Sequence, residues 1–338
     1  MSLNEYKIDD AAVAEWLPWG GLLLPHIMRQ KDGSYFSVIK YSSYIENTIK
    51  KIAHLEYKRG WAIWIEKQHK NTDEYFITIC WNPFYSSTGK ISNTLTPTQI
   101  TRSGELTYFD NTIKKIAADI SIALPNCQLL ERQELLNFLS FTLSFDTNEV
   151  KTPPIYLYLD IYLSENIKID FGDNNILIND KMVMILSLPA CPGQTTIQKI
   201  YELFNNVPYR YVKRIIMLSK KEAEIDYRKY TKSWCNNHSV IKSMIMADLL
   251  SDINGYYSEN FLILLNQDIY YKIQKNCKEF LADFKIPYIL ESYNLKDIWW
   301  GSIPGIFRAN ITPPLTCFNL FHELLILNKK ENGENHVS

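Results

Sequence analysis

Runs of β-branched and aromatic residues, separated by short turn sequences, limit the fold of this chain more than any other feature. One run follows Trp19 and extends to residue 29, another covers residues 34–41, and Lys-Asp-Gly stands between them. Because an Asp-Gly pair readily takes up the backbone angles of a tight turn, this segment predicts a β-hairpin with a solvated turn. Residues 61–69 and 75–81 form a further pair of runs. The first part of the chain is therefore expected to build an antiparallel sheet.

Amphipathic helices are predicted between and after these strands. Residues 109–124 and 131–145 place apolar side chains on one face, at intervals of three or four positions. Spacing of this kind is typical of a helix that buries one face, so the stripes are interpreted as packing residues and not as cofactor contacts. A capping box at residues 43–46 predicts one more helix. The two stripes consist of Ile113, Ile116, Ala117 and Ile120, and of Leu135, Leu136, Leu139 and Leu143.

The second half of the chain returns to β-rich runs after a polar segment, residues 146–154, that ends in Pro-Pro. Such a segment predicts a domain boundary. We expect an α+β fold with two subdomains, residues 1–150 and 151–327, each a mixed, largely antiparallel sheet packed with helices, and a disordered tail at 328–338. The chain would end in a Pro/Gly-rich closing segment. Strands are predicted at 155–163, 167–171, 176–178, 182–188, from 207 onwards, at 261–265 and at 286–292, with helices at 195–206, 219–250 and 268–284.

The closing segment, residues 299–319, reads WWGSIPGIFRANITPPLTCFN. It combines two adjacent tryptophans with several proline and glycine turns. One interpretation is that Trp299 and Trp300 end an amphipathic helix and that an ordinary exit loop follows. The other is a docking site, because aromatic and rigid residues are concentrated there.

Three segments of the chain resemble the N-terminal region of the VirB4/TrbE/CagE family of conjugative transfer and type IV secretion ATPases. The L-P-W and K-D-G-S motifs stand at 17–19 and 31–34, and a P-Y-R-W-V-x-R-x-I motif at 208–216 carries Tyr211 in place of tryptophan. The W-x-G-S-x-P-G motif and its continuation are matched by Trp299, Gly301, Ser302, Pro304, Gly305, Asn310, Pro314, Leu315, Asn319, Leu320, Leu324 and Leu325.

The resemblance implies a role in conjugation or type IV secretion. Partners would be channel subunits of the inner membrane, further copies of the chain, or a separately encoded ATPase domain. A basic group at 210–214 could instead contact an acidic partner or nucleic acid, although basic residues on a strand need no ligand. The candidate interaction residues are Trp19, Tyr209, Arg210, Lys213, Arg214, Trp299, Gly301, Pro304, Gly305 and Asn310.

Composition limits the kinds of partner, bound group and cellular compartment that we expect for this chain. The 36 basic and 37 acidic residues leave a net charge of −1, which argues against a dominant basic face and makes nucleic acid a disfavoured partner. The six cysteines include no C-x-x-C pair, so we expect neither a zinc site nor a disulfide framework but buried thiols in a reducing compartment. No signal segment or membrane-spanning run is recognised, and a cytoplasmic protein, peripheral on the inner membrane, is predicted.

Catalytic motifs are missing from the sequence. Gly89-Lys90 is not a phosphate-binding loop, because Phe84 replaces the required glycine and Ile91 the required serine or threonine. Without that loop we expect no autonomous ATP hydrolysis and no cofactor, ATP being bound only by a separate motor domain. His69 is a lone histidine with no visible serine, cysteine or carboxylate partner and is interpreted as a surface residue.

Three hypotheses remain open at this point. The favoured one is a non-catalytic interaction module, the N-terminal region of a VirB4/TrbE-like ATPase. The second is a degenerate remnant of a split or duplicated gene. The third is an unrelated enzyme with an unrecognised site, for which Glu131, Asp160 and His69 are the candidate residues.

Overall fold

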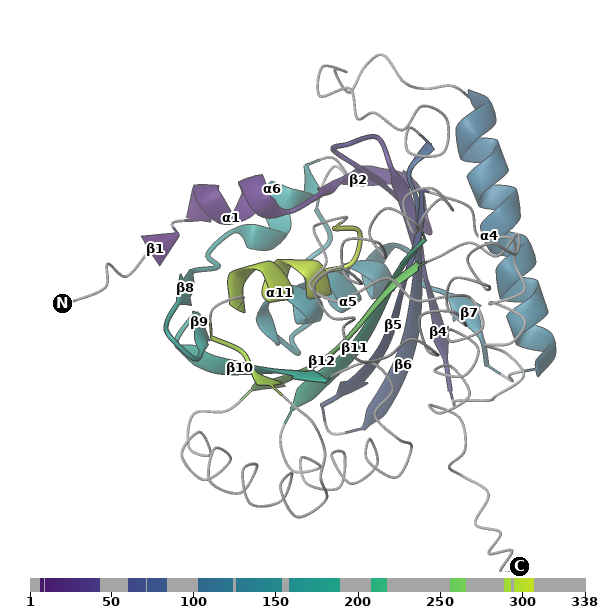
Figure 1. Cartoon of the computed structure of the whole chain (residues 1–338). Coiled ribbons are helices and arrows are strands. Elements are labelled where there is room, and N and C mark those ends of the chain that lie inside the picture. The colour runs from purple at the N-terminus through teal and green to yellow at the C-terminus, as the bar shows by residue number, and fades with distance from the viewer. Residues whose placement is uncertain are drawn as a thin grey trace, which may run out of the picture.

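A single curved sheet with helices on both faces forms the described part of this protein, as shown by a computed structural model (Figure 1). The described residues are 7–8, 10–42, 60–70, 72–83, 103–123, 126–153, 158–188, 208–217, 256–265, 289–292 and 295–306. Helices and antiparallel strands occur together, so the predicted α+β class is confirmed.

The strand bounds are β1 Lys7–Ile8, β2 Trp19–Leu24, β3 Ile27–Gln30, β4 Tyr35–Tyr41, β5 Trp61–His69, β6 Asp73–Trp81, β7 Gln128–Leu129, β8 Ile169–Phe171, β9 Ile176–Ile178, β10 Lys181–Leu188, β11 Tyr209–Met217, β12 Tyr256–Leu265 and β13 Ile289–Leu290. The helices are α1 Asp10–Trp16, α4 Ser103–Ala123, α5 Arg132–Ser144, α6 Leu159–Ser164 and α11 Leu295–Ser302. The order across the sheet is β1-β8-β9-β10-β12-β11-β5-β6-β4-β3-β2, with β13 beside β10 and β7 beside β4.

The sheet continues across the predicted domain boundary. β11, from the second half of the chain, pairs antiparallel with β5 from the first half, with Tyr209 opposite His69 and Ile216 opposite Ala62. β12 then pairs with the other edge of β11. Strands from both sides of residue 150 thus share one sheet. The division of the chain into two subdomains at that residue stays a prediction.

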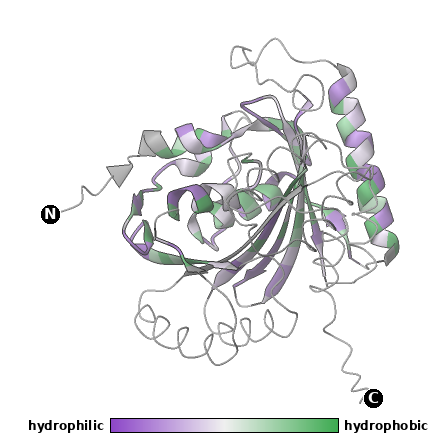
Figure 2. Cartoon of the chain, in the orientation of Figure 1, coloured by the Kyte–Doolittle hydropathy of each residue, from purple (hydrophilic) through white to green (hydrophobic). Residues whose placement is uncertain are grey.

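Apolar side chains cover both faces of this sheet. Successive residues of a strand point to opposite faces, so Trp64 of β5 belongs to one core cluster while Ile63 and Ile65 belong to the other. The first cluster includes side chains of α1, α5, α6 and α11, and Figure 1 shows α5 and α11 inside the curve of the sheet. Helix α4 covers the outer face, and hydrophobic and hydrophilic patches alternate around it in Figure 2.

Several predictions of local structure are confirmed. The hairpin joins β3 to β4, and Gly33 takes a φ of 83° in its turn. Strands β5, β6 and β11 lie where the sequence predicts them, as do helices α4 and α5. The isoleucines of the α4 stripe and the leucines of the α5 stripe are buried, and Ala117 packs partly buried beside them.

Two strand predictions are wrong. The apolar run after Trp19 is broken into β2 and β3 by a turn at Pro25 and His26, since proline has no N–H group to donate to a sheet. The run predicted as a strand at 155–163 contains helix α6 instead. Its Leu159 and Leu163 are four residues apart and both buried, which puts them on one face of a helix.

Other predictions fall outside the described residues. These are the helix that begins at the capping box 43–46, the helices at 195–206, 219–250 and 268–284, Gly89-Lys90, Asn310 with the rest of the closing segment after residue 306, and the tail. Among the described helices, none is both long enough and apolar enough to cross a bilayer.

Candidate functional site

The three segments that carry the family resemblance meet on the inner face of the sheet. We call this meeting point the closing-segment anchor; it comprises Trp19, Trp64, Glu66, Arg210, Arg214 and residues 299–306. The anchor joins residues separated by as many as 285 positions in the sequence, because the Trp19 indole Nε1 donates to the Pro304 carbonyl at 3.2 Å. It therefore holds the start of the closing segment against the body of the sheet.

Arg210 is the centre of the anchor. Its side chain is fully buried and forms a two-pronged ion pair with Glu66, with Nε to Oε1 at 2.7 Å and Nη2 to Oε2 at 3.0 Å. The paired strands β11 and β5 place Gln68 opposite Arg210, and Gln68 Nε2 donates to the same carboxylate at 2.7 Å. A planar guanidinium matched to a carboxylate in this way forms short, charge-assisted hydrogen bonds and fixes the geometry of both partners.

The same guanidinium reaches the ends of two helices. Arg210 Nη1 donates to the Thr142 carbonyl, near the end of α5, at 2.8 Å, and Nη2 donates to the Ser302 carbonyl, at the end of α11, at 3.2 Å. The last carbonyls of a helix have no partner within it and carry the negative end of its dipole. A buried cation thus satisfies groups that would otherwise lie unpaired in the core.

Arg214 and Trp64 complete this arrangement at α11. Arg214 Nη1 donates to the carbonyls of Gly301 at 3.3 Å and Ile306 at 3.4 Å, and Trp64 Nε1 donates to Gly301 at 3.1 Å. Both donors are buried. The chain is therefore held on each side of the turn that follows α11.

The glycines of the closing segment are required by this packing. A Cβ atom on Gly301 would lie 2.6 Å from Arg214 Nη1, and one on Gly305 would lie 1.8 Å from Gln30 Nε2. Gly305 also has a φ of 91°, a left-handed value that side chains disfavour. Steric contact therefore accounts for both glycines of the W-x-G-S-x-P-G motif.

The paired tryptophans point into the core. Trp299 and Trp300 have 0% of their surface exposed, and Trp300 stacks on Trp16 with ring centroids 5.7 Å apart. Lys296 Nζ lies 4.3 Å from the centroid of the same Trp16 ring, which is a cation–π contact. Trp300 thus fixes α11 against α1, and this burial fits the interpretation that the two tryptophans end an amphipathic helix.

The candidate interaction residues are distributed unevenly. The structure brings together Trp19, Arg210, Arg214, Trp299, Gly301, Pro304 and Gly305, all inside the fold. Tyr209 and Lys213 are buried too, but they alternate with the arginines along β11 and face the other side of the sheet. The rings of Tyr209 and His69 stack with their centroids 5.1 Å apart. Burial, together with the negative charge of Asp73, raises the pKa of the Tyr209 hydroxyl.

Sequence reasoning missed two members of the anchor, Trp64 and Glu66, and also Thr142, whose carbonyl accepts from Arg210. Glu66 carried only a weak signal, because it follows directly on the apolar Trp61–Ile65 run but is itself followed by the polar Lys67, Gln68 and His69. A carboxylate that becomes buried needs a buried partner. The sequence gives no indication of which cation supplies it.

The prediction that His69 has no carboxylate partner is wrong. The β5–β6 hairpin brings Asp73 Oδ1 to 2.7 Å from His69 Nδ1, while Lys67 Nζ lies 2.8 Å from Asp73 Oδ2. Burial would raise the pKa of Asp73, but these two hydrogen-bonding partners outweigh it and the pKa is lowered.

The candidates for an unrecognised enzyme lie on different elements. His69 ends β5, Glu131 is exposed in front of α5, and Asp160 is a buried residue of α6. Asp160 is paired with Lys31 at 2.6 Å, so the hairpin turn, whose Lys31 and Asp32 are exposed as predicted, is also tied to α6. No cluster of potential metal ligands occurs in the part of the chain that the structure describes.

Comparison with known proteins shows a distant similarity to a conjugal transfer protein. No family model matches the chain. The chain is similar to the conjugal transfer protein TrbE of Rhizobium radiobacter. The two are 21% identical over 227 residues, which cover 59% of this chain and 27% of TrbE. The chain thus aligns with about a quarter of its relative's length, and the similarity supports a distant VirB4/TrbE-like relationship.

Proposed function

We propose that this chain is a non-catalytic module of a VirB4/TrbE-like type IV secretion or conjugative transfer machine. In this role it acts in assembly, by docking to channel subunits at the inner membrane, to further copies of itself or to a separate ATPase domain. The similarity to a conjugal transfer protein supports the setting, and the closing-segment anchor supports the role.

The observation that carries the proposal is the convergence of the resembling motifs. Trp19, Arg210, Arg214 and the turn after α11 come from three distant parts of the sequence and bind one another directly. Motifs that form one packed unit have a common structural task. Here that task is to hold the turn after α11 in place as far as Ile306, the last described residue of the closing segment.

A protein partner is favoured over nucleic acid. Arg210 and Arg214 are the basic residues that a nucleic acid would use, but they are 0% and 2% exposed and bind a carboxylate and backbone carbonyls. Phosphate contacts need accessible cations. These arginines are therefore assigned to the interior of the fold. As a separate part of the proposal, the protein lies in the cytoplasm, peripheral on the inner membrane.

ATP hydrolysis is assigned to another domain. The chain carries no phosphate-binding loop, so in this proposal ATP is a ligand only of a motor domain acting with it. The purified chain should show no ATPase activity above a blank with Mg²⁺. A Walker-A-bearing protein encoded beside it should bind it in size-exclusion chromatography at micromolar concentration.

The alternatives give different results in this experiment. ATP turnover by the chain alone would overturn the non-catalytic assignment and favour an enzyme with an unrecognised site. Failure to bind both the neighbouring motor protein and the channel subunits would favour a degenerate remnant.

A further inference from the structure

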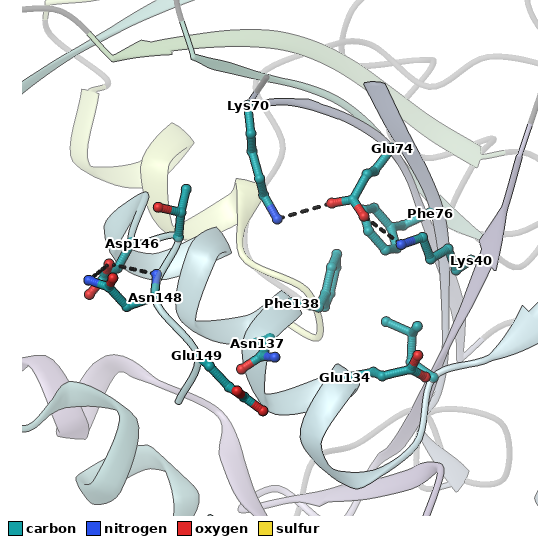
Figure 3. Close-up of a pocket in the computed structure, with 12 residues that line it drawn as sticks. Lys40, Lys70, Glu74, Phe76, Glu134, Asn137, Phe138, Asp146, Asn148 and Glu149 are labelled. Atoms are coloured by element: carbon teal, nitrogen blue, oxygen red, sulfur yellow. Dashed lines mark hydrogen bonds and ion pairs between the residues drawn. The ribbon is translucent and has the colours of Figure 1, made fainter. Parts of the chain in front are cut away.

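We draw no further inference here: the strongest candidate, the polar cavity of about 320 Å³ between the sheet and α5 (Figure 3), carries nothing because Glu134, Asp146 and Glu149 form only an acidic cluster and no second observation points to a ligand.

Discussion

Replacing Arg210 with methionine should destabilise the protein more than any surface substitution, because it leaves a buried charge unpaired. Methionine fills a similar volume but cannot donate to Glu66, which is 1% exposed. Removing one partner of a buried ion pair costs about 3–5 kcal/mol. The carbonyls of Thr142 and Ser302 lose a donor as well, at about 1 kcal/mol each where no water replaces it. We therefore expect a loss of about 5–7 kcal/mol in the free energy of unfolding.

The assay is urea unfolding followed by circular dichroism and tryptophan fluorescence. Arg132→Met, at an exposed arginine that begins α5, is the matched control and should cost less than about 0.5 kcal/mol. Adding Glu66→Gln to Arg210→Met removes the unpaired charge and should recover about 2 kcal/mol, since contacting residues are not additive. A loss under about 1 kcal/mol for Arg210→Met, or strict additivity in the double variant, would refute the reasoning.

Two further predictions concern the stability of the closing segment and the loss of protein stability at low pH. Gly305→Ala should lower the free energy of unfolding by about 2–3 kcal/mol in thermal melts, because the φ of Gly305 is 91° and the added Cβ would meet Gln30. The control Gly104→Ala, whose added Cβ would have nothing within 4 Å, should be neutral or slightly stabilising. Equal melting temperatures for the two variants would contradict this prediction. The pKa of Glu74 is lowered by its two lysine partners, despite burial, from the ordinary 4.5. Its stabilisation is thus present above that pH and lost as the pH falls below it. Glu74→Gln should therefore lose less stability than the unaltered protein between about pH 5 and pH 3, and parallel urea midpoints would count against it.

Local elements were predictable because their signals are local. The stripes of α4 and α5 and the Asp-Gly turn before β4 depend on residues a few positions apart, and all three are present. Helix α6 was missed because its short apolar run fits a strand equally well. The pairing of β11 with β5 could not be predicted, because it depends on which of many apolar strands lie side by side. The spacing of residues within one strand does not identify its neighbour in the sheet.

The anchor was recognised only in part. Tryptophans, glycines and arginines at 210, 214 and 299–305 stand out in the sequence, but exposed and buried arginines look alike there. Burial of Arg210 follows from Glu66 on the neighbouring strand and from the carbonyls at two helix ends, which come together only in the folded chain.

The most direct test of the docking role is crosslinking and affinity purification of the tagged chain from its native host, with conjugation genes expressed and membranes intact. We expect inner-membrane channel subunits or a protein with a phosphate-binding loop to be recovered with the chain, and this recovery to be lost in a Gly305→Ala variant that remains folded by circular dichroism. Recovery of the chain alone, under conditions in which the channel subunits still copurify with one another, would contradict it.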